Sequence, residues 1–182
     1  IVQGPPPGRA WSRAATGAVD ELLVQLAAPW SGRYRLAVVA VGGYGRRELS
    51  PASDIDLLLL HDGLEVETLE RVVRGVIYPL WDAGLTVGYA VRDRRESLAA
   101  VDDVDSATAM LDLRTVVGDA SFVQLVRTEV IRRLSRRPHR FLAALRDADL
   151  TRARLKGARL NEATQLDEKW RLVWQVVNQG AP

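Results

Sequence analysis

The spacing of apolar residues along the chain predicts several amphipathic helices. In residues 9–28 and 65–82, apolar side chains recur every three or four positions, which places them on one face of a helix. Pro79 is expected to kink or end the second of these helices, because proline lacks an amide hydrogen and clashes with the preceding turn. Two or three further helices are predicted at about 95–113 and 119–135.

Three other stretches have the pattern of strands. Residues 35–41 are a run of apolar and β-branched side chains, residues 54–61 begin with alternating acidic and apolar positions, and residues 84–92 alternate throughout. The uninterrupted apolar run from Leu57 to Leu60 predicts a central strand, since burial on both faces removes the alternation. The fold class is therefore mixed α/β (α+β), with a small mixed sheet and helices packed on one side of it.

The two ends of the chain differ from the part between them in composition and in the spacing of their apolar residues. Residues 1–8 are rich in proline and glycine and are expected to form a disordered leader. Residues 9–140 are predicted to form the main domain. In the tail, residues 141–182, alanine recurs every five positions from Ala143, and leucine follows two positions later. This tail is expected to be a mainly helical segment or a short remnant of a pentapeptide-like repeat, packed loosely on the domain and not needed for its site.

Composition and charge exclude several classes of function. With 47% apolar and 26% charged residues the chain is expected to fold around a core, and without cysteine it has no disulfide scaffold or thiolate zinc site. No apolar run has membrane-spanning length and no signal peptide is visible, so we expect a soluble, cytoplasmic protein with no membrane partner. The basic stretch 127–159 contains a single aromatic residue, Phe141, which makes nucleic acid an unlikely partner.

The stretch 42–60 carries the candidate chemistry. Gly42 and Gly43 follow a predicted buried strand, and two adjacent glycines let the backbone approach a ligand with no Cβ in the way. Eleven residues after Gly43 come Asp54 and Asp56, which lie on the same face of a strand because side chains alternate. Two neighbouring carboxylates repel each other, and a bound magnesium ion relieves that repulsion. This spacing therefore predicts a metal and phosphate site.

The sequence GGYGRRELSPASDIDLLLL at 42–60 resembles the signature of the DNA polymerase beta-like nucleotidyltransferases. Its fuller form is similar to the N-terminal domain of the bacterial PII uridylyltransferase/uridylyl-removing family, with supporting stretches at 78–92 and 106–119. The resemblance implies the polymerase beta-like nucleotidyltransferase fold over roughly residues 15–140. The tail instead resembles the end of a pentapeptide-repeat protein.

The resemblance also implies a reaction and a set of residue roles. Asp54 and Asp56 would hold Mg²⁺, Gly42 and Gly43 would cradle the triphosphate, and Arg46 and Ser53 would lie beside it; these six residues are the candidate site. The implied reaction is transfer of UMP or AMP from UTP or ATP to a tyrosine hydroxyl of PII, the nitrogen-regulatory signal protein, with release of pyrophosphate. The alternatives are a catalytically inactive nucleotide-binding module and a nucleotidyltransferase with a different acceptor.

The chain departs from the family pattern at several positions. The family usually has glycine where Arg47 stands and commonly has histidine where Tyr89 stands. The superfamily also has a third carboxylate on a later strand, whereas the predicted strand 84–92 contains none. Asp93, just past that strand, and Asp112, in a stretch with a helical pattern, are the two candidates for this third acid.

Overall fold

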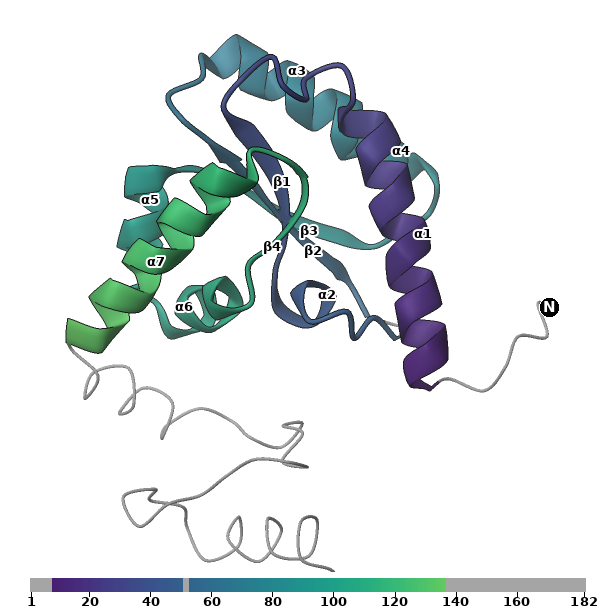
Figure 1. Ribbon diagram of the computed structural model, residues 1–182. Coiled ribbons are helices and arrows are strands. Elements are labelled where there is room, and N and C mark those ends of the chain that lie inside the picture. Colours follow the sequence, from purple (N-terminus) through teal and green to yellow (C-terminus); the bar gives the residue numbers. More distant parts are fainter. Residues whose placement is uncertain (1–7, 51–52, 137–182) are drawn as a thin grey trace, which may run out of the picture. The chain divides into compact units, whose positions relative to one another are not determined.

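The computed structural model describes residues 8–50 and 53–136 (Figure 1). Its helices and strands, in chain order, are α1 (Arg9–Ala27), β1 (Leu36–Ala40), α2 (Gly42–Gly45), β2 (Ile55–His61), α3 (Val66–Val76), α4 (Tyr78–Asp82), β3 (Val87–Asp93), α5 (Arg94–Ala100), α6 (Val104–Leu111), β4 (Arg114–Gly118) and α7 (Ala120–Arg136). The predicted mixed α/β class is confirmed.

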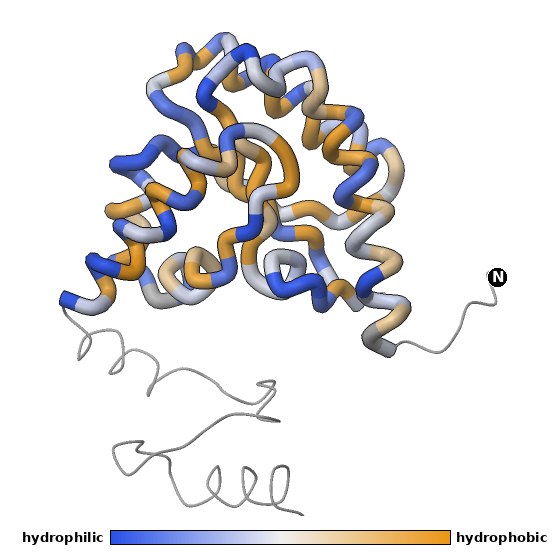
Figure 2. Tube along the Cα trace, viewed as in Figure 1, coloured by the Kyte–Doolittle hydropathy of each residue, from blue (hydrophilic) through white to orange (hydrophobic). Residues whose placement is uncertain are grey.

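The four strands form one mixed sheet in the order β3-β2-β1-β4. β1 runs antiparallel to both β2 and β4, whereas β2 and β3 are parallel. β2 is an interior strand, as the apolar run from Leu57 to Leu60 predicted, and all four of these leucines are buried. Figure 2 shows the apolar residues gathered along the strands and on the inner sides of the helices.

Helices cover both faces of this sheet (Figure 1). On one face, Leu23 of α1 and Val76 of α3 pack in the same core cluster as Leu57 of β2. On the other face, α7 contacts β1 and β4, and its Phe122 and Val126 are fully buried. The expectation of helices on one side of the sheet was therefore wrong. Alternate leucines of β2 point to opposite faces, so each face needs its own apolar cover.

The predicted helices are present, with breaks that their sequences explain. The stretch 65–82 forms α3 and α4, which are separated at Ile77, and Pro79 lies in the first turn of α4, where its missing amide hydrogen costs nothing. The stretch 95–113 also divides, because Asp103 begins a new helix by accepting a hydrogen bond from the amide of Ser106 at 2.9 Å.

The strand β4 is absent from the expectations drawn from the sequence. Its five residues, Arg114–Gly118, lie between two helices and carry no strong alternation. They form a strand because they pair with β1, a partner more than seventy positions away in the chain, with Val38 opposite Val117. Pairing at such a distance leaves little local signal.

Of the leader predicted at 1–8, residues 1–7 lie outside the described residues, and so does the whole tail predicted at 141–182. Among the helices that the structure does describe, none combines the length and the apolar character needed to cross a membrane.

Candidate functional site

The Gly42–Gly45 turn lies beside the start of β2. β1 ends at Ala40 opposite Leu57, so the chain that leaves β1 runs next to the first residues of β2. The amide of Val41 donates to the carbonyl oxygen of Asp56 at 3.1 Å. Gly42 then takes a left-handed conformation with a φ of 56°, and a Cβ built there would lie 3.6 Å from Oδ2 of Asp56. The structure therefore brings this glycine and this carboxylate together, as the sequence predicted.

The second side of the Asp56 carboxylate faces another glycine. Gly88 of β3 is the register partner of Asp56, and a Cβ at Gly88 would lie 3.0 Å from Oδ1 of Asp56. Gly42 and Gly88 thus lie on either side of the Asp56 carboxylate. Because neither glycine has a side chain, neither fills the space around the carboxylate oxygen atoms. Asp54 lies two residues earlier, just before β2 begins, and both aspartates are exposed.

The two carboxylates have the donor chemistry of a divalent-cation site. Although Asp56 is exposed as a whole residue, partial burial of its carboxyl group, and after it the charge of Asp54, raises the pKa of this carboxyl above its usual value. No hydrogen bond or ion pair within residues 8–50 and 53–136 reaches either side chain, so this repulsion is not offset by a cation of the protein. Magnesium prefers carboxylate oxygens and usually takes one or two of them together with substrate phosphates. Asp54 and Asp56 fit that requirement.

A third carboxylate does not join this pair in the described part of the chain, where no group of three or more histidine, cysteine or acidic side chains lies close enough to hold a metal. Asp93 is at the wrong end of the sheet, since β3 is parallel to β2 and Asp93 pairs with His61. It also caps α5, because its carboxylate accepts from the amide of Glu96 at 2.7 Å. Asp93 therefore has a structural role and is not the third acid.

Asp112, the other candidate, is bound by an arginine of the glycine-rich loop. Arg46 donates from its Nη1 to Oδ2 of Asp112 at 2.5 Å and from its Nε to Oε2 of Glu48 at 3.0 Å. Its guanidinium stands beside the turn, since a Cβ at Gly43 would lie 4.0 Å from Nη2 of Arg46. Arg46 thus lies beside the turn, and neither of these two hydrogen bonds uses Nη2, the guanidinium nitrogen that faces Gly43.

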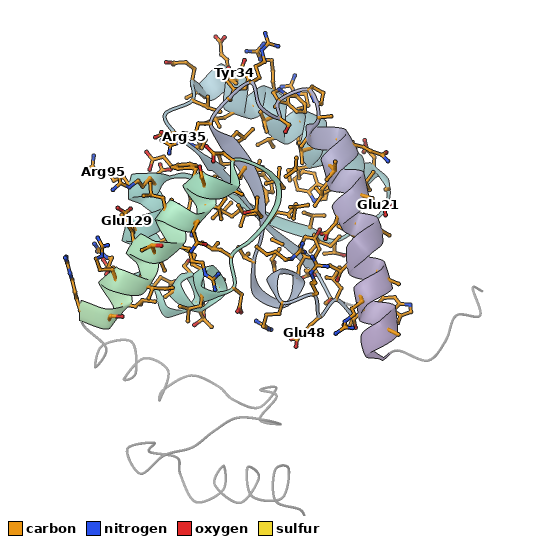
Figure 3. All side chains as sticks on the ribbon, in the orientation of Figure 1. Glu21, Tyr34, Arg35, Glu48, Arg95 and Glu129 are labelled. Carbon is orange, nitrogen blue, oxygen red and sulfur yellow. The ribbon has the colours of Figure 1, made fainter. Side chains whose placement is uncertain are left out.

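The loop that leads into Asp54 is stabilised by Ser53. The Ser53 hydroxyl donates to the carbonyl oxygen of Ser50 at 3.0 Å and accepts from the amide of Ser50 at 2.7 Å. The side chain therefore closes a local turn just before the first aspartate. Figure 3 shows Glu48 at the end of the sheet where α2 lies, with Arg35 at the other end.

Two family departures have visible structural consequences. Arg47 is the one residue other than glycine in the described ranges that has a positive φ, at 61°. Glycine at this position would adopt the same conformation without a Cβ clash. Tyr89 alternates with Gly88 along β3, so its ring lies on the face away from Asp56, where it is tilted against Trp81 with the ring centroids 5.8 Å apart.

Replacing Arg47 by glycine is expected to raise the free energy of unfolding by up to about 1 kcal/mol. The left-handed conformation costs an L-residue about 1–2 kcal/mol, and the greater freedom of glycine in the unfolded chain cancels part of the gain. Denaturant unfolding measures the change. Arg47→Ala is the matched control: it removes the same charge but keeps the Cβ, so no gain is expected, and an equal gain in both variants would show that the charge is responsible.

Three residues that the sequence did not single out anchor the turn. The hydroxyl of Tyr44 donates to Oδ1 of Asp20 in α1 at 2.6 Å. Arg114 of β4 binds the same carboxylate through Nη1 at 2.8 Å and Nη2 at 3.0 Å. Their positions are separated by up to 94 residues in the sequence, so no local pattern indicates that they meet.

The curated proteins that this chain resembles include enzymes of one name from several bacteria. No family model matches the chain. It is 35% identical over 155 residues to the bifunctional uridylyltransferase/uridylyl-removing enzyme of Streptomyces coelicolor, covering 85% of this chain and 18% of that protein. It is 41% identical over 125 residues to the enzyme of the same name from Azotobacter vinelandii, covering 68% of this chain and 14% of that protein.

Among solved structures, the chain is similar to the crystal structure of a toxin-antitoxin with AMP-PNP. The TM-score is 0.45 at 14% sequence identity, covering 70% of this chain and 96% of that one. At this TM-score and sequence identity, the similarity says nothing about the residues of the site. The curated relatives are named as uridylyltransferases, and this chain spans less than a fifth of the length of the two compared above. The chain is therefore a homologue of one segment of the bifunctional uridylyltransferase/uridylyl-removing enzymes.

Proposed function

We propose that this domain is a magnesium-dependent nucleotidyltransferase that moves UMP or AMP from UTP or ATP to a tyrosine hydroxyl of the PII nitrogen-regulatory protein. The observation that carries the proposal is the pair of carboxylates Asp54 and Asp56, which have no cationic partner among the described residues, with Asp56 placed against the backbone of Gly42. The names of the curated relatives support the same activity. Because PII is the proposed acceptor, the proposed location is the cytoplasm.

Each residue of the site has a definite task in such a transfer. Asp54 and Asp56 would hold magnesium, which neutralises charge on the phosphates when it is bound. Gly42 and Gly43 present backbone without a Cβ, so the triphosphate can approach closely beside Asp56. Arg46 stands beside this turn. It is the arginine that the resemblance assigns to phosphate binding.

The covalent change is an in-line displacement at the α-phosphorus. The tyrosine oxygen forms the new bond to phosphorus, and the bond from phosphorus to the pyrophosphate oxygen breaks. The hydroxyl proton of the tyrosine must also leave, and it would pass to solvent water, because Asp54 and Asp56 must stay ionised to hold the cation. Positioning and charge neutralisation are expected to supply most of the rate.

Calorimetry of UTP and ATP binding tests the site directly. Wild-type protein is expected to bind nucleotide at least about tenfold more tightly with magnesium than with a chelator, because the carboxylates gain a shared cation. Asp54→Asn and Asp56→Asn are each expected to remove most of this magnesium effect. If both variants keep it, the metal site lies elsewhere.

Magnesium binding is expected to weaken on acidification at a higher pH than for an ordinary aspartate pair. The pKa of Asp56 is raised by partial burial and by Asp54, and a protonated carboxyl does not bind the metal. Calorimetric titration with magnesium over a series of pH values measures this profile.

The metal-free protein provides the control for this pH effect. A raised pKa means that the folded protein binds more protons than the unfolded chain, so stability falls as the pH rises from the ordinary aspartate pKa through the raised pKa of Asp56. Asp56→Asn should remove this slope from the unfolding free energy. An unchanged slope would mean that another group causes it.

A second candidate function is a catalytically inactive nucleotide-binding module. The absence of an acid on β3 beside Asp56, where Gly88 stands, favours it, and so does the strained Arg47 in the loop. Magnesium-dependent binding of UTP or ATP without transfer to any PII tyrosine would support this module. Transfer to another hydroxyl, with PII unmodified, would support a different acceptor.

A further inference from the structure

We propose that Asp20, Tyr44 and Arg114 are positioning residues of the nucleotide site: they hold the Gly42–Gly45 turn against Asp56 without touching the nucleotide. The inference rests on the proposed function for what the turn binds, but the network itself can be tested without any nucleotide. It joins α1, α2 and β4, which are far apart in the sequence.

Arg114 is the centre of this network. Besides its two bonds to Asp20, its guanidinium donates from Nε to the carbonyl oxygen of Gly45 and from Nη2 to that of Tyr44, both at 3.2 Å. The same guanidinium lies 5.0 Å from the centre of the Tyr44 ring. A planar group with fixed donors thus binds two successive carbonyl groups at the end of the turn and a carboxylate of α1. A lysine ammonium does not reproduce this set.

The network is shielded from water. Tyr44 is fully buried, and the side chains of Arg114 and Asp20 are 17% and 21% exposed. Burial, followed by the hydrogen bond to Asp20, raises the pKa of the Tyr44 hydroxyl, so it remains a donor at all ordinary pH values. Hydrogen bonds with a charged partner in such surroundings are stronger than those on an open surface.

The position of the turn has little freedom on its other side. A Cβ at Gly45 would lie 2.2 Å from the carbonyl oxygen of Asp112, so the backbone of the turn already touches the chain between α6 and β4. Gly42, three residues earlier, is the residue that faces the Asp56 carboxylate. A shift of the turn therefore changes the space beside Asp56, and a misplacement of about 1 Å at a reacting site can cost about 100-fold in rate.

Two variants separate positioning from simple stabilisation. Arg114→Lys keeps the positive charge but loses the planar guanidinium and its set of donors, and Tyr44→Phe removes only the hydroxyl. The matched control is Arg35→Lys: Arg35 also pairs with an aspartate, Asp62 at 2.8 Å, but precedes β1 at the opposite end from the turn. Each protein is compared in its unfolding free energy, in backbone amide exchange without nucleotide, and in affinity for magnesium with UTP or ATP.

We expect Arg114→Lys to speed exchange of the Gly45 and Glu48 amides by about tenfold or more, with a smaller change in Tyr44→Phe. In the wild type these amides donate to the carbonyl oxygens of Val41 and Gly43, both at 2.9 Å. Nucleotide affinity should fall by a similar factor in Arg114→Lys, while Arg35→Lys changes neither quantity even if it is less stable.

The inference is wrong if Arg114→Lys is folded and both its loop exchange and its nucleotide affinity stay within about twofold of wild type. If Arg114→Lys does not fold, Tyr44→Phe decides by the same exchange measurement. If the wild-type protein binds no magnesium nucleotide, the proposed function is contradicted but the positioning network is not. Amide exchange in the free protein still decides whether the network orders the turn.

Discussion

Asp56→Asn is expected to lower the rate of magnesium-dependent nucleotidyl transfer by about 100-fold or more. The amide keeps the size of the side chain but loses the charge that would hold the cation, and loss of one preorganised electrostatic group that stabilises a transition state costs about 100- to 1,000-fold in other enzymes. Asp54→Asn is expected to have an effect of the same order, since the two carboxylates would share the metal. The measurement is the rate of label transfer from α-labelled nucleotide at saturating magnesium.

Asp62→Asn is the control for these two variants. Asp62 directly follows β2 at the end opposite to Asp56, where it pairs with Arg35. Its replacement removes the same charge from the same part of the sequence and is expected to leave transfer within about twofold of wild type, since exposed ion pairs contribute little. Equal losses in all three variants would indicate a general effect of charge or folding and would remove Asp54 and Asp56 from the metal site.

Gly45→Ala is expected to lower the free energy of unfolding by about 2–4 kcal/mol. The added methyl group would lie 2.2 Å from the Asp112 carbonyl oxygen and 3.1 Å from that of Ala40, and both are backbone atoms that cannot turn aside. Overpacking of this kind typically costs about 1–3 kcal/mol, and displacing the turn also strains the hydrogen bonds from Arg114. Chemical denaturation measures the loss.

Gly17→Ala provides the matched comparison. Gly17 is inside α1, and a Cβ at this position meets no heavy atom within 4 Å. Alanine there is expected to raise the free energy of unfolding by about 0.5–1 kcal/mol through its greater helix propensity. A Gly45→Ala protein as stable as wild type would show that the turn has room to move away from Asp112.

The parts of the fold that were predictable are those with local signals. The apolar run after Asp56 indicated a central strand, and the periodicity of residues 65–82 indicated the helix that forms α3 and α4. β4 and the second helical layer were not predictable in the same way. β4 depends on pairing with β1, and the layer formed by α5, α6 and α7 depends on which face of β2 each leucine occupies.

In the site, too, the contacts that were predictable are those with a local sequence signal. Gly42 and Asp56 are brought together by two adjacent strands, so their spacing in the sequence was enough to predict the contact. Asp20 and Arg114 were missed because each is an ordinary charged residue in its own segment, and only the folded structure places both on Tyr44. Whether a carboxylate is a ligand or a helix cap also depends on the fold, as Asp93 shows.

Mass spectrometry of PII after incubation with this protein tests the central claim most directly. With magnesium and either UTP or ATP, we predict that PII gains the mass of one nucleoside monophosphate per modified tyrosine, that peptide mapping places it on a tyrosine, and that chelation or Asp56→Asn prevents it. Unmodified PII, in the presence of folded protein that binds magnesium and nucleotide, would contradict the proposed transfer.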